Sequence, residues 1–329
     1  MSRAALVLLF MTAGCAKSPD AGKPKVGFLL STLQEERYQK DKAYFESAAR
    51  ALGLAPFTLA ADNDNARQLD EVEDALARGA KVLVIQPTDS AAAGAYVSKA
   101  HEDGVPVVAY DRDIKSGAVD YYVAHDSFHV GVLQAEAAVK ATGGRGNFVL
   151  LDGQSGHSVA MEIVRGYYSV LQPLIDAGRV HVVVEKWHDA WSPEQALKTV
   201  EDALAKTNGD LAAILANNSG MARGAVQAVQ AARLKNVFIA GADADAANVE
   251  YVCEGKQSVE VLKAIKPLAE RAAAVAAELV RTGMVAGGNG KAGKTPVAAV
   301  AVNLVDRANA RALVIDSGFQ SAASLPACK

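Results

Sequence analysis

Short runs of apolar residues alternate with segments of helical periodicity along the chain from Lys25 onward. The apolar runs are too continuous to alternate between a buried and an exposed face, which is typical of parallel strands covered on both faces. In the first part of the chain they predict strands at 26–30, 57–60, 82–86 and 107–110, with helices between them. This rhythm, with right-handed crossovers, indicates a doubly wound parallel α/β sheet.

The same pattern starts again after an apolar run at 121–124. The second unit has predicted strands at 148–151, 180–184, 213–215 and 237–240, each followed by a helix. A further strand at 258–262, a helix at 267–281 and an apolar run at 297–304 then indicate a chain that crosses back to the first unit and again to the second. We therefore expect an α/β protein of two doubly wound parallel-sheet lobes joined by a three-strand hinge. The expected N-terminal lobe comprises 24–125 and 259–296, and the C-terminal lobe comprises 126–258 and 297–329.

Residues 1–15 have the pattern of an export signal. Arg3 supplies a positive charge, and the apolar stretch 4–11 is far shorter than the ~20 residues that span a bilayer. The stretch from Thr12 to Cys15 resembles a bacterial lipobox, apart from Thr12 itself, where that pattern prefers leucine. We expect an exported protein that is anchored by a lipid on Cys15, with 16–23 as a tether and no other membrane segment. An ordinary cleaved secretory signal is the alternative.

Charge and cysteine content narrow the function classes. The chain has 34 Lys+Arg against 37 Asp+Glu, a net charge of −3 and no basic run, which argues against a nucleic-acid partner. Besides Cys15 the chain contains only Cys253 and Cys328. An oxidising compartment permits a disulfide between these two, but the sequence leaves that pairing open because it cannot place their Cα atoms.

Polar side chains follow several predicted strands at the point where each strand ends. Asp111 and Arg112 come directly after the strand at 107–110. In open α/β sheets the ligand crevice lies outside the carboxyl ends of the strands, so we expect these side chains to share one site. Carboxylates, amides and forked cations pair with sugar hydroxyls, and a flat aromatic ring covers the C–H face of a sugar. The other residues of this kind are Arg37, Tyr38, Asp126, Trp191, Asn217, Asp243 and Lys263. Trp187 is expected in the core.

An enzymatic alternative uses Asp111 and Asp243 as the two carboxyl groups of a glycoside hydrolase. Arg112 and Lys263 argue against it, because nearby positive charges keep carboxylates ionised and neither could then act as the acid. A hydrolytic triad is disfavoured because no nucleophile elbow is present. We therefore expect no catalytic residue and no enzymatic activity.

Two apparent cofactor motifs also lack their structural context. Residues 288–295 match the phosphate-binding P-loop pattern, but a helix precedes them and an apolar run follows, so we expect a flexible loop without nucleotide. His125 and His129 are four residues apart, yet a helix that begins at Asp126 would leave His125 outside it. We expect no metal and no cofactor.

The chain resembles the periplasmic sugar-binding protein family, and in particular its D-xylose-binding members, over nearly the whole mature chain. The matching pieces are Glu36-Arg37 with Gln39-Lys40-Asp41, 82–87, Ala109-Tyr110-Asp111-Arg112, Val130-Gly131 with Leu133-Gln134-Ala135, Trp187 and Trp191 with Pro193-Glu194, and Asp243-Ala244-Asp245. The resemblance implies a type I binding-protein fold whose lobes close on one monosaccharide, D-xylose or a similar pentose, and deliver it to an ABC permease. We expect a monomer in the periplasm or cell envelope. A lipoprotein that presents the sugar to a receptor for sensing is the alternative.

The resemblance also implies roles for single residues. Arg37, Asp111, Arg112, Asn217, Asp243 and Lys263 match positions that hydrogen-bond the sugar, and Trp191 matches an aromatic residue that stacks on it. Tyr38 stands where the family has tryptophan. The family carries an Asp-Asn-Asn trio after the strand at 148–151, whereas this chain has Ser158-Val159-Ala160, of which Ser158 is expected to contact the ligand. A hydroxyl left unpaired by the missing amides costs about 1–3 kcal/mol, which is enough to change the preferred sugar.

Overall fold

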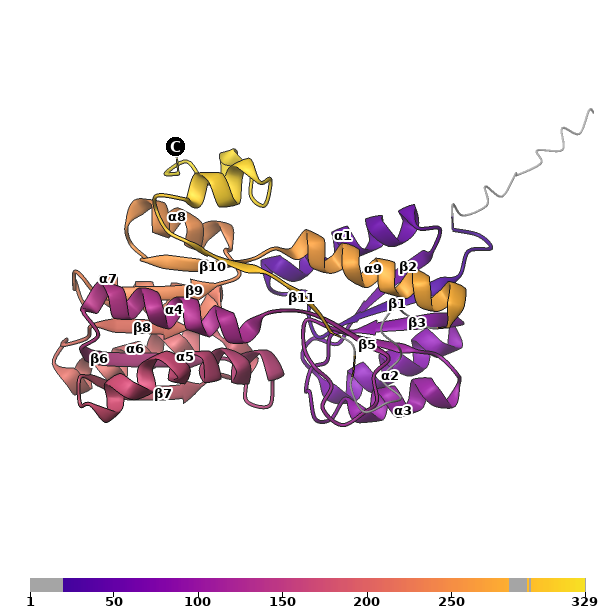
Figure 1. Cartoon of the computed structure of the whole chain (residues 1–329), viewed down its shortest axis with the longest axis horizontal. Helices are drawn as coiled ribbons and strands as arrows, with labels where there is room; N and C mark the ends of the chain where they lie inside the picture. Colours follow the sequence, from indigo (N-terminus) through magenta and orange to yellow (C-terminus); the bar gives the residue numbers. More distant parts are fainter. Residues whose placement is uncertain (1–19, 284–294, 296, 329) are drawn as a thin grey trace, which may run out of the picture.

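Two lobes lie end to end along the long axis of the molecule (Figure 1). The computed structural model describes residues 20–283, 295 and 297–328. The predicted export signal with Cys15, residues 16–19 of the predicted tether and residues 288–294 of the P-loop-like stretch lie outside the described residues. In the part that is described, no helix is long and apolar enough to cross a membrane.

The N-terminal lobe is a six-stranded parallel sheet with the order β11-β5-β4-β3-β1-β2. Its strands are β1 Lys25–Leu30, β2 Ala55–Ala60, β3 Ala80–Ile85, β4 Val107–Tyr110, β5 Tyr121–His125 and β11 Val297–Val300. Helices α1 (Glu36–Ala51) and α9 (Ile265–Thr282) cover one face, and α2 (Asn65–Ala77) and α3 (Gly94–Glu102) cover the other. Successive side chains of one strand enter opposite cores, as Phe28 and Leu29 do, which explains why the strands are apolar throughout.

The C-terminal lobe repeats this strand order as β12-β10-β9-β8-β6-β7. Its strands are β6 Gly146–Asp152, β7 Val180–Trp187, β8 Ala213–Ala216, β9 Phe238–Ala242, β10 Val259–Lys263 and β12 Val302–Val305. Its helices are α4 Ser127–Thr142, α5 Ser158–Asp176, α6 Pro193–Thr207, α7 Ser219–Ala231 and α8 Ala246–Glu254. The last strand differs between the lobes, since β12 is antiparallel to β10 whereas β11 is parallel to β5.

The chain crosses between the lobes three times, which confirms the expected three-strand hinge. The crossings fall at Asp126 between β5 and α4, at Ala264 between β10 and α9, and at Ala301 between β11 and β12. Hydrogen bonds tie the three connections together: the Asp126 N–H donates to Val300 O at 3.3 Å, and a ring nitrogen of His125 lies 3.1 Å from Ala264 O.

The expected lobe boundaries are wrong at two of these crossings. Strand β10 pairs with β9 in the C-terminal sheet rather than with the N-terminal lobe, and β11 pairs with β5 in the N-terminal sheet. The apolar run at 297–304 was expected to be one strand of the C-terminal lobe, but it is divided between the two sheets. An apolar pattern reports burial, and both sheets bury it, so the pattern does not tell which sheet receives the strand.

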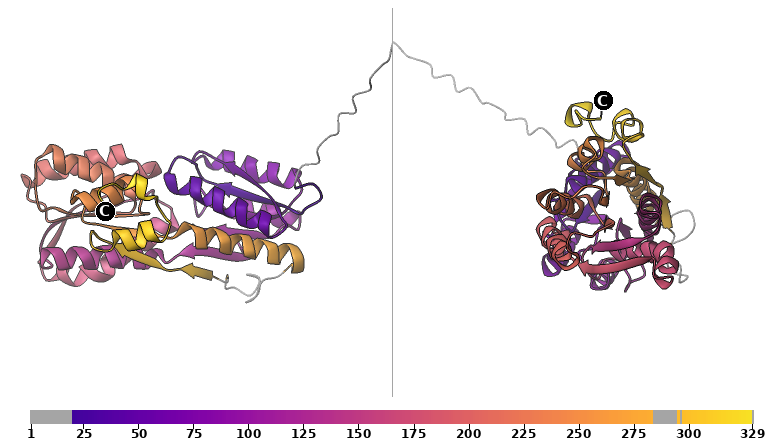
Figure 2. Two further views of the ribbon diagram at one scale, coloured as in Figure 1. Left: turned by 90° about the horizontal axis from the view of Figure 1, so that it is seen from above. Right: turned by 90° about the vertical axis from the view of Figure 1, so that its left-hand side faces the viewer.

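The C-terminal segment packs beside α8 (Figure 2). It contains short helical turns at Arg311–Asp316 and Ala322–Ser324 and buries Val314 and Leu325 against Val249 of α8. A disulfide joins Cys253 of α8 to Cys328 across 75 residues, which settles the pairing that the sequence left open. The same segment also reaches the other lobe, because the Gln320 amide donates to the Glu36 carboxylate of α1 at 2.7 Å.

Candidate functional site

The carboxyl ends of the strands of both lobes face each other at the interface between the lobes. A single cavity there collects every predicted ligand-binding residue except Ser158. Arg37 and Tyr38 come from α1, and Asp111 and Arg112 follow β4. The C-terminal lobe supplies Trp191 after β7, Asn217 after β8, Asp243 after β9 and Lys263 at the end of β10. The lining also includes Glu35, Val159 and Asn218, which were not predicted.

A buried network of two acids and two bases spans the interface. The Arg37 guanidinium lies 3.1 Å from the Asp111 carboxylate of its own lobe and 3.4 Å from the Asp243 carboxylate of the other lobe. Lys263 Nζ lies 3.2 Å from Asp243 and 3.8 Å from Asp111. Each cation therefore contacts a carboxylate from each lobe, which joins the lobes, and Arg37 also pairs with Asp41 of its own helix at 3.3 Å.

The same backbone conformation positions the Asp111 carboxylate in one lobe and the Asp243 carboxylate in the other. Asp111 and Asp243 each follow the strand at the corresponding place in its sheet and have φ angles of 60° and 97°. Their N–H groups donate to Val123 O and Val261 O of the neighbouring strands at 2.8 and 2.9 Å. Positive φ costs a non-glycine residue of order 1–3 kcal/mol and persists where the surrounding structure imposes it. The sharp turn directs each side chain into the cavity.

Asp111 remains ionised although it is buried. Burial alone would raise its pKa, but the positive charges of Arg37 and Lys263 outweigh burial and hold the pKa of Asp111 well below its usual range. An ionised carboxylate only accepts hydrogen bonds and has no proton to give. Asp111 is therefore suited to accept hydrogen bonds from ligand hydroxyls and unsuited to act as the acid of a hydrolase.

Arg112 and Tyr38 are hydrogen-bonded to each other on the side of the cavity that the N-terminal lobe forms. The Arg112 guanidinium donates to Pro87 O and to the Tyr38 hydroxyl, both at 3.0 Å. The centroid of the Tyr38 ring lies 5.1 Å from the Arg37 guanidinium carbon, which is within cation–π range. Tyr38 is therefore a rigid aromatic wall whose orientation is fixed by two arginines.

Trp191 forms the aromatic wall of the C-terminal lobe. Its ring lies against Gly153, where a Cβ atom would come within 2.4 Å of the indole, so only glycine fits beneath it. The indole Nε1 atom is buried and has no hydrogen-bond partner among the described residues. A buried donor of this kind needs an acceptor, which a ligand oxygen can supply.

The amide and hydroxyl groups at the cavity have partners within the protein. Asn217 Oδ1 accepts from the Gly153 N–H at 2.8 Å, and its amide nitrogen donates to the Tyr167 hydroxyl at 3.2 Å. Asn218 Oδ1 accepts from the Met221 N–H and so caps α7. The Asn217 amide therefore has one further hydrogen that it can donate, and the Asn218 amide has two.

Ser158 lies beside the cavity rather than in its lining. Its Oγ atom accepts from the Asp113 N–H of the other lobe at 2.8 Å, and its N–H donates to Ser90 Oγ at 3.2 Å. The neighbouring Val159 lines the cavity instead, because it lies one helix position further on.

Trp187 also differs from expectation, since its side chain is 37% exposed instead of lying in the core. Asp126 acts as the N-cap of α4.

The free space between these side chains is about 20 Å³, which is room for about one water molecule. A monosaccharide is several times larger, so it has to displace contacts that the side chains make with one another. The contacts between lobes, Arg37 with Asp243 and Lys263 with Asp111, are made by residues that line this space. The two lobes therefore meet across the cavity in this structure.

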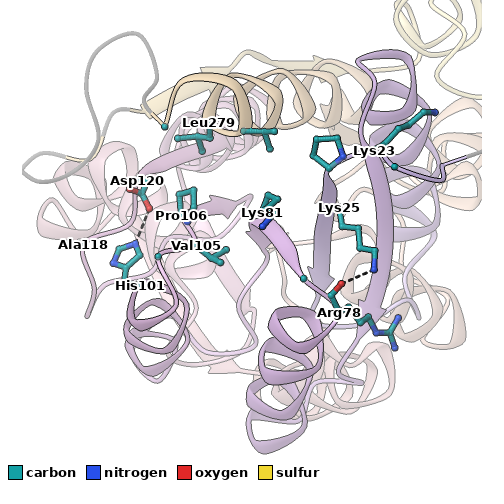
Figure 3. Close-up of a pocket in the computed structure, with 16 residues that line it drawn as sticks. Lys23, Lys25, Arg78, Lys81, His101, Val105, Pro106, Ala118, Asp120 and Leu279 are labelled. Carbon is teal, nitrogen blue, oxygen red and sulfur yellow. Dashed lines mark hydrogen bonds and ion pairs between the residues drawn. The ribbon is translucent and has the colours of Figure 1, made fainter.

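A larger cavity of about 900 Å³ lies at the far end of the N-terminal lobe (Figure 3). It opens at the amino ends of the strands, and dashed lines in the figure mark two pairs among the labelled polar groups. Lys25 Nζ donates to Arg78 O at 2.8 Å, and His101 lies 2.9 Å from Asp120. None of the predicted ligand-binding residues lines it. Among the described residues, no cluster of three or more histidine, cysteine or acidic side chains could hold a metal ion.

Asp152, at the end of β6, makes stability depend on pH. Its carboxyl oxygens are buried without a hydrogen-bond partner in the described part of the chain, and burial, followed by the charge of Glu185, raises the pKa of Asp152 to about 8. Between its ordinary pKa of 3.8 and 8, the folded chain keeps a proton that the unfolded chain releases, so the free energy of unfolding falls as pH rises. We expect Asp152→Asn to flatten part of this fall, measured as the difference between urea midpoints at pH 5 and pH 8. Glu260, Glu71 and Asp41 contribute to the rest, because burial also raises their pKa values, to about 8, 7 and 6. An unchanged difference in Asp152→Asn would contradict this role for Asp152.

Comparison with known proteins gives consistent similarities. The family described as periplasmic binding protein domain matches residues 26–283. The chain is 37% identical over 260 residues to the D-xylose-binding periplasmic protein of Escherichia coli, covering 79% of this chain and 78% of that protein. It is 34% identical to the D-xylose-binding periplasmic protein of Haemophilus influenzae over 92% of each chain. A carbohydrate transporter solute binding protein from Chloroflexus aurantiacus, solved in complex with D-glucose, superposes with a TM-score of 0.83 at 32% identity, over 91% of this chain and 97% of that one.

Proposed function

The chain belongs to the periplasmic binding protein domain family, and on that premise we propose that it captures one uncharged monosaccharide in the interlobe cavity and delivers it to an ABC permease. Its relatives are binding proteins without catalytic activity, so the hydrolase alternative is set aside. D-xylose or a similar pentose is the sugar we propose, in line with the two D-xylose-binding relatives.

The charge balance of the cavity carries this proposal. Three acids and three bases contribute to the lining: Glu35, Asp111 and Asp243 against Arg37, Arg112 and Lys263. A charged ligand would leave this balance unmatched, whereas an uncharged polyol offers donors to the carboxylates and acceptors to the cations. Tyr38 and Trp191 add aromatic surface for the C–H groups of a sugar ring.

Closure of the lobes accounts for both capture and release. The Arg37–Asp243 and Lys263–Asp111 contacts form only when the lobes meet. A bound sugar would replace them with hydrogen bonds to both lobes, and binding would then favour the closed arrangement by its differential affinity for it. A permease that opens the lobes would release the sugar.

We propose further that the protein is a monomer held at the periplasmic face of a membrane by a lipid on Cys15. The lipobox-like sequence and the polar tether support this anchor. A Cys15→Ser variant expressed in a Gram-negative host would then be released into the soluble periplasmic fraction, while the wild-type chain would stay with the membranes. Equal partition of the two chains would contradict the anchor and would leave the sugar site unaffected.

A ligand screen tests the function directly. The chain expressed from residue 16 is titrated in thermal-unfolding assays with pentoses, hexoses and inositols. A ligand that binds only the folded state at 1,000 times its Kd stabilises by about 4.1 kcal/mol, so micromolar binding is visible at millimolar sugar. We expect a shift with D-xylose, confirmed by calorimetric titration. If a different sugar raises the unfolding temperature, Tyr38 and Val159 are the residues to which the changed sugar preference would be assigned. If no sugar raises the unfolding temperature, the proposal is overturned.

A further inference from the structure

We propose that Glu35 is an additional ligand-binding residue that determines which monosaccharide the cavity prefers, by accepting a hydrogen bond from one ligand hydroxyl. This inference rests on the proposed sugar-binding function and adds to it a residue that the strand-end pattern does not contain. Glu35 lines the interlobe cavity immediately before α1.

No hydrogen bond joins the Glu35 carboxylate to another residue of the described chain. It occupies the N-cap position of α1, yet its side chain makes no capping hydrogen bond, and the helix start uses its backbone oxygen, which accepts from the Tyr38 N–H at 3.1 Å. Its Oε2 atom is buried and has no hydrogen-bond partner among the described residues. Buried carboxylate oxygens are normally satisfied, so this one requires a partner from outside the protein.

Glu36, the next residue, shows what a structural acid at this place does. One of its oxygens accepts from Gln320 at 2.7 Å and lies 2.8 Å from Lys40, and the other accepts from the Ala246 N–H of the opposite lobe at 3.2 Å. Glu36 therefore acts on lobe closure, outside the cavity lining, while Glu35 faces the cavity. Glu35 and Glu36 are neighbouring acids with different surroundings, so a substitution of Glu36 serves as a control for a substitution of Glu35.

The charged groups around Glu35 are engaged with other partners. Burial raises the pKa of Glu35, and the Arg112 guanidinium is the cation that opposes this rise most, but Arg112 donates to Pro87 O and to Tyr38. Arg37 is paired with Asp111 and Asp243. The hydrogen bond that Glu35 lacks therefore has to come from a donor that enters the cavity, and the donors of an uncharged sugar are its hydroxyl groups.

An apolar residue of the C-terminal lobe also lines the cavity. Val159 of α5 offers neither a donor nor an acceptor to a ligand. A sugar hydroxyl beside Val159 therefore stays unpaired there, whereas one beside Glu35 finds an acceptor. The predicted ligand class is a neutral monosaccharide with a free hydroxyl at that ring position, and a deoxy sugar lacking it should bind weakly.

The test is a cycle that combines one side-chain change with one ligand change. Calorimetric Kd values are measured for the sugar selected by the thermal screen and for each of its monodeoxy derivatives, with wild-type, Glu35→Ala and Glu36→Gln proteins. We expect the loss of one particular sugar hydroxyl to weaken binding to the wild-type protein by about 10- to 100-fold, as for a hydrogen bond to a charged group. The loss of the same hydroxyl should weaken binding to the Glu35→Ala protein less than threefold. Glu35→Gln, which keeps an acceptor oxygen, should recover part of the discrimination.

The control separates recognition from closure. Glu36→Gln should weaken the binding of every sugar by the same factor, so the relative affinities for the parent sugar and its deoxy derivatives should stay unchanged. If Glu35→Ala keeps the full wild-type pattern, or if a bound water satisfies Glu35 so that no single deoxy position is coupled to it, the inference is wrong. Wild-type protein that binds none of the sugars would instead overturn the proposed function.

Discussion

Replacing Asp111 with alanine is expected to abolish measurable sugar binding and to lower the free energy of unfolding by about 3 kcal/mol, the low end of the cost of breaking a buried ion pair. Arg37 and Lys263 both lie against this carboxylate, and the Asp111 side chain is only 3% exposed. The cost stays at the low end because Asp243 continues to pair with both cations. Calorimetric titration and urea unfolding measure the two effects.

Asp243→Ala provides the comparison for this variant. The Asp243 side chain is more exposed, at 14%, so its loss should cost less stability than the loss of Asp111. It should impair binding to a similar degree, because it is the acceptor that the C-terminal lobe brings to the closed cavity. Titrations of Asp111→Ala that match the wild type would refute the assigned site, and equal stability losses would refute the ranking by burial.

Removing the Cys253–Cys328 disulfide is expected to lower the free energy of unfolding by about 2–4 kcal/mol, the typical contribution of a native cross-link. The bond closes a long stretch of chain, with a sequence separation of 75 between the cysteines, which restricts the unfolded chain strongly. Both sulfurs lie in the small core between α8 and the C-terminal segment. Urea unfolding of Cys253→Ser/Cys328→Ser against the oxidised wild type measures the effect.

Two controls make this measurement specific. The wild-type protein in excess dithiothreitol should unfold with the midpoint of the double-serine variant, and dithiothreitol should leave that variant unchanged. Coincident curves for the oxidised wild type and the double variant would show that the C-terminal segment is held by packing alone.

The fold and most of the candidate site could be predicted because both follow from local patterns. Continuous apolar runs mark strands buried on two faces, and the carboxyl ends of parallel strands meet at one edge of a sheet. In each lobe this edge carries one aspartate, and the two edges face each other, so Asp111 and Asp243, 132 positions apart in the sequence (243 minus 111), line one cavity. Their left-handed backbone could not be predicted, because hydrogen bonds to the neighbouring strands, and not the residue type alone, impose it.

The errors have a common physical origin in contacts between distant parts of the chain. The apolar run at 297–304 is divided between two sheets by hydrogen bonds to β5 and β10, which no periodicity records. Ser158 was expected in the site, but a contact with Asp113 of the other lobe turns it toward the interface. Glu35 was missed because it precedes a helix instead of ending a strand. Its buried oxygen is visible only once the lobes are placed together.

The three crossings at Asp126, Ala264 and Ala301 also govern the order in which the protein is completed during synthesis. The first sheet lacks its cover helix α9 and its edge strand β11 until residue 300 has been made, long after the first 125 residues. At ribosomal rates this delay lasts roughly 10–35 s. Neither lobe is a continuous piece of chain, so both reach their full sheets only as the last residues appear. A protein built in this way stays incomplete for most of its synthesis, which suits a chain that is threaded across a membrane before it folds.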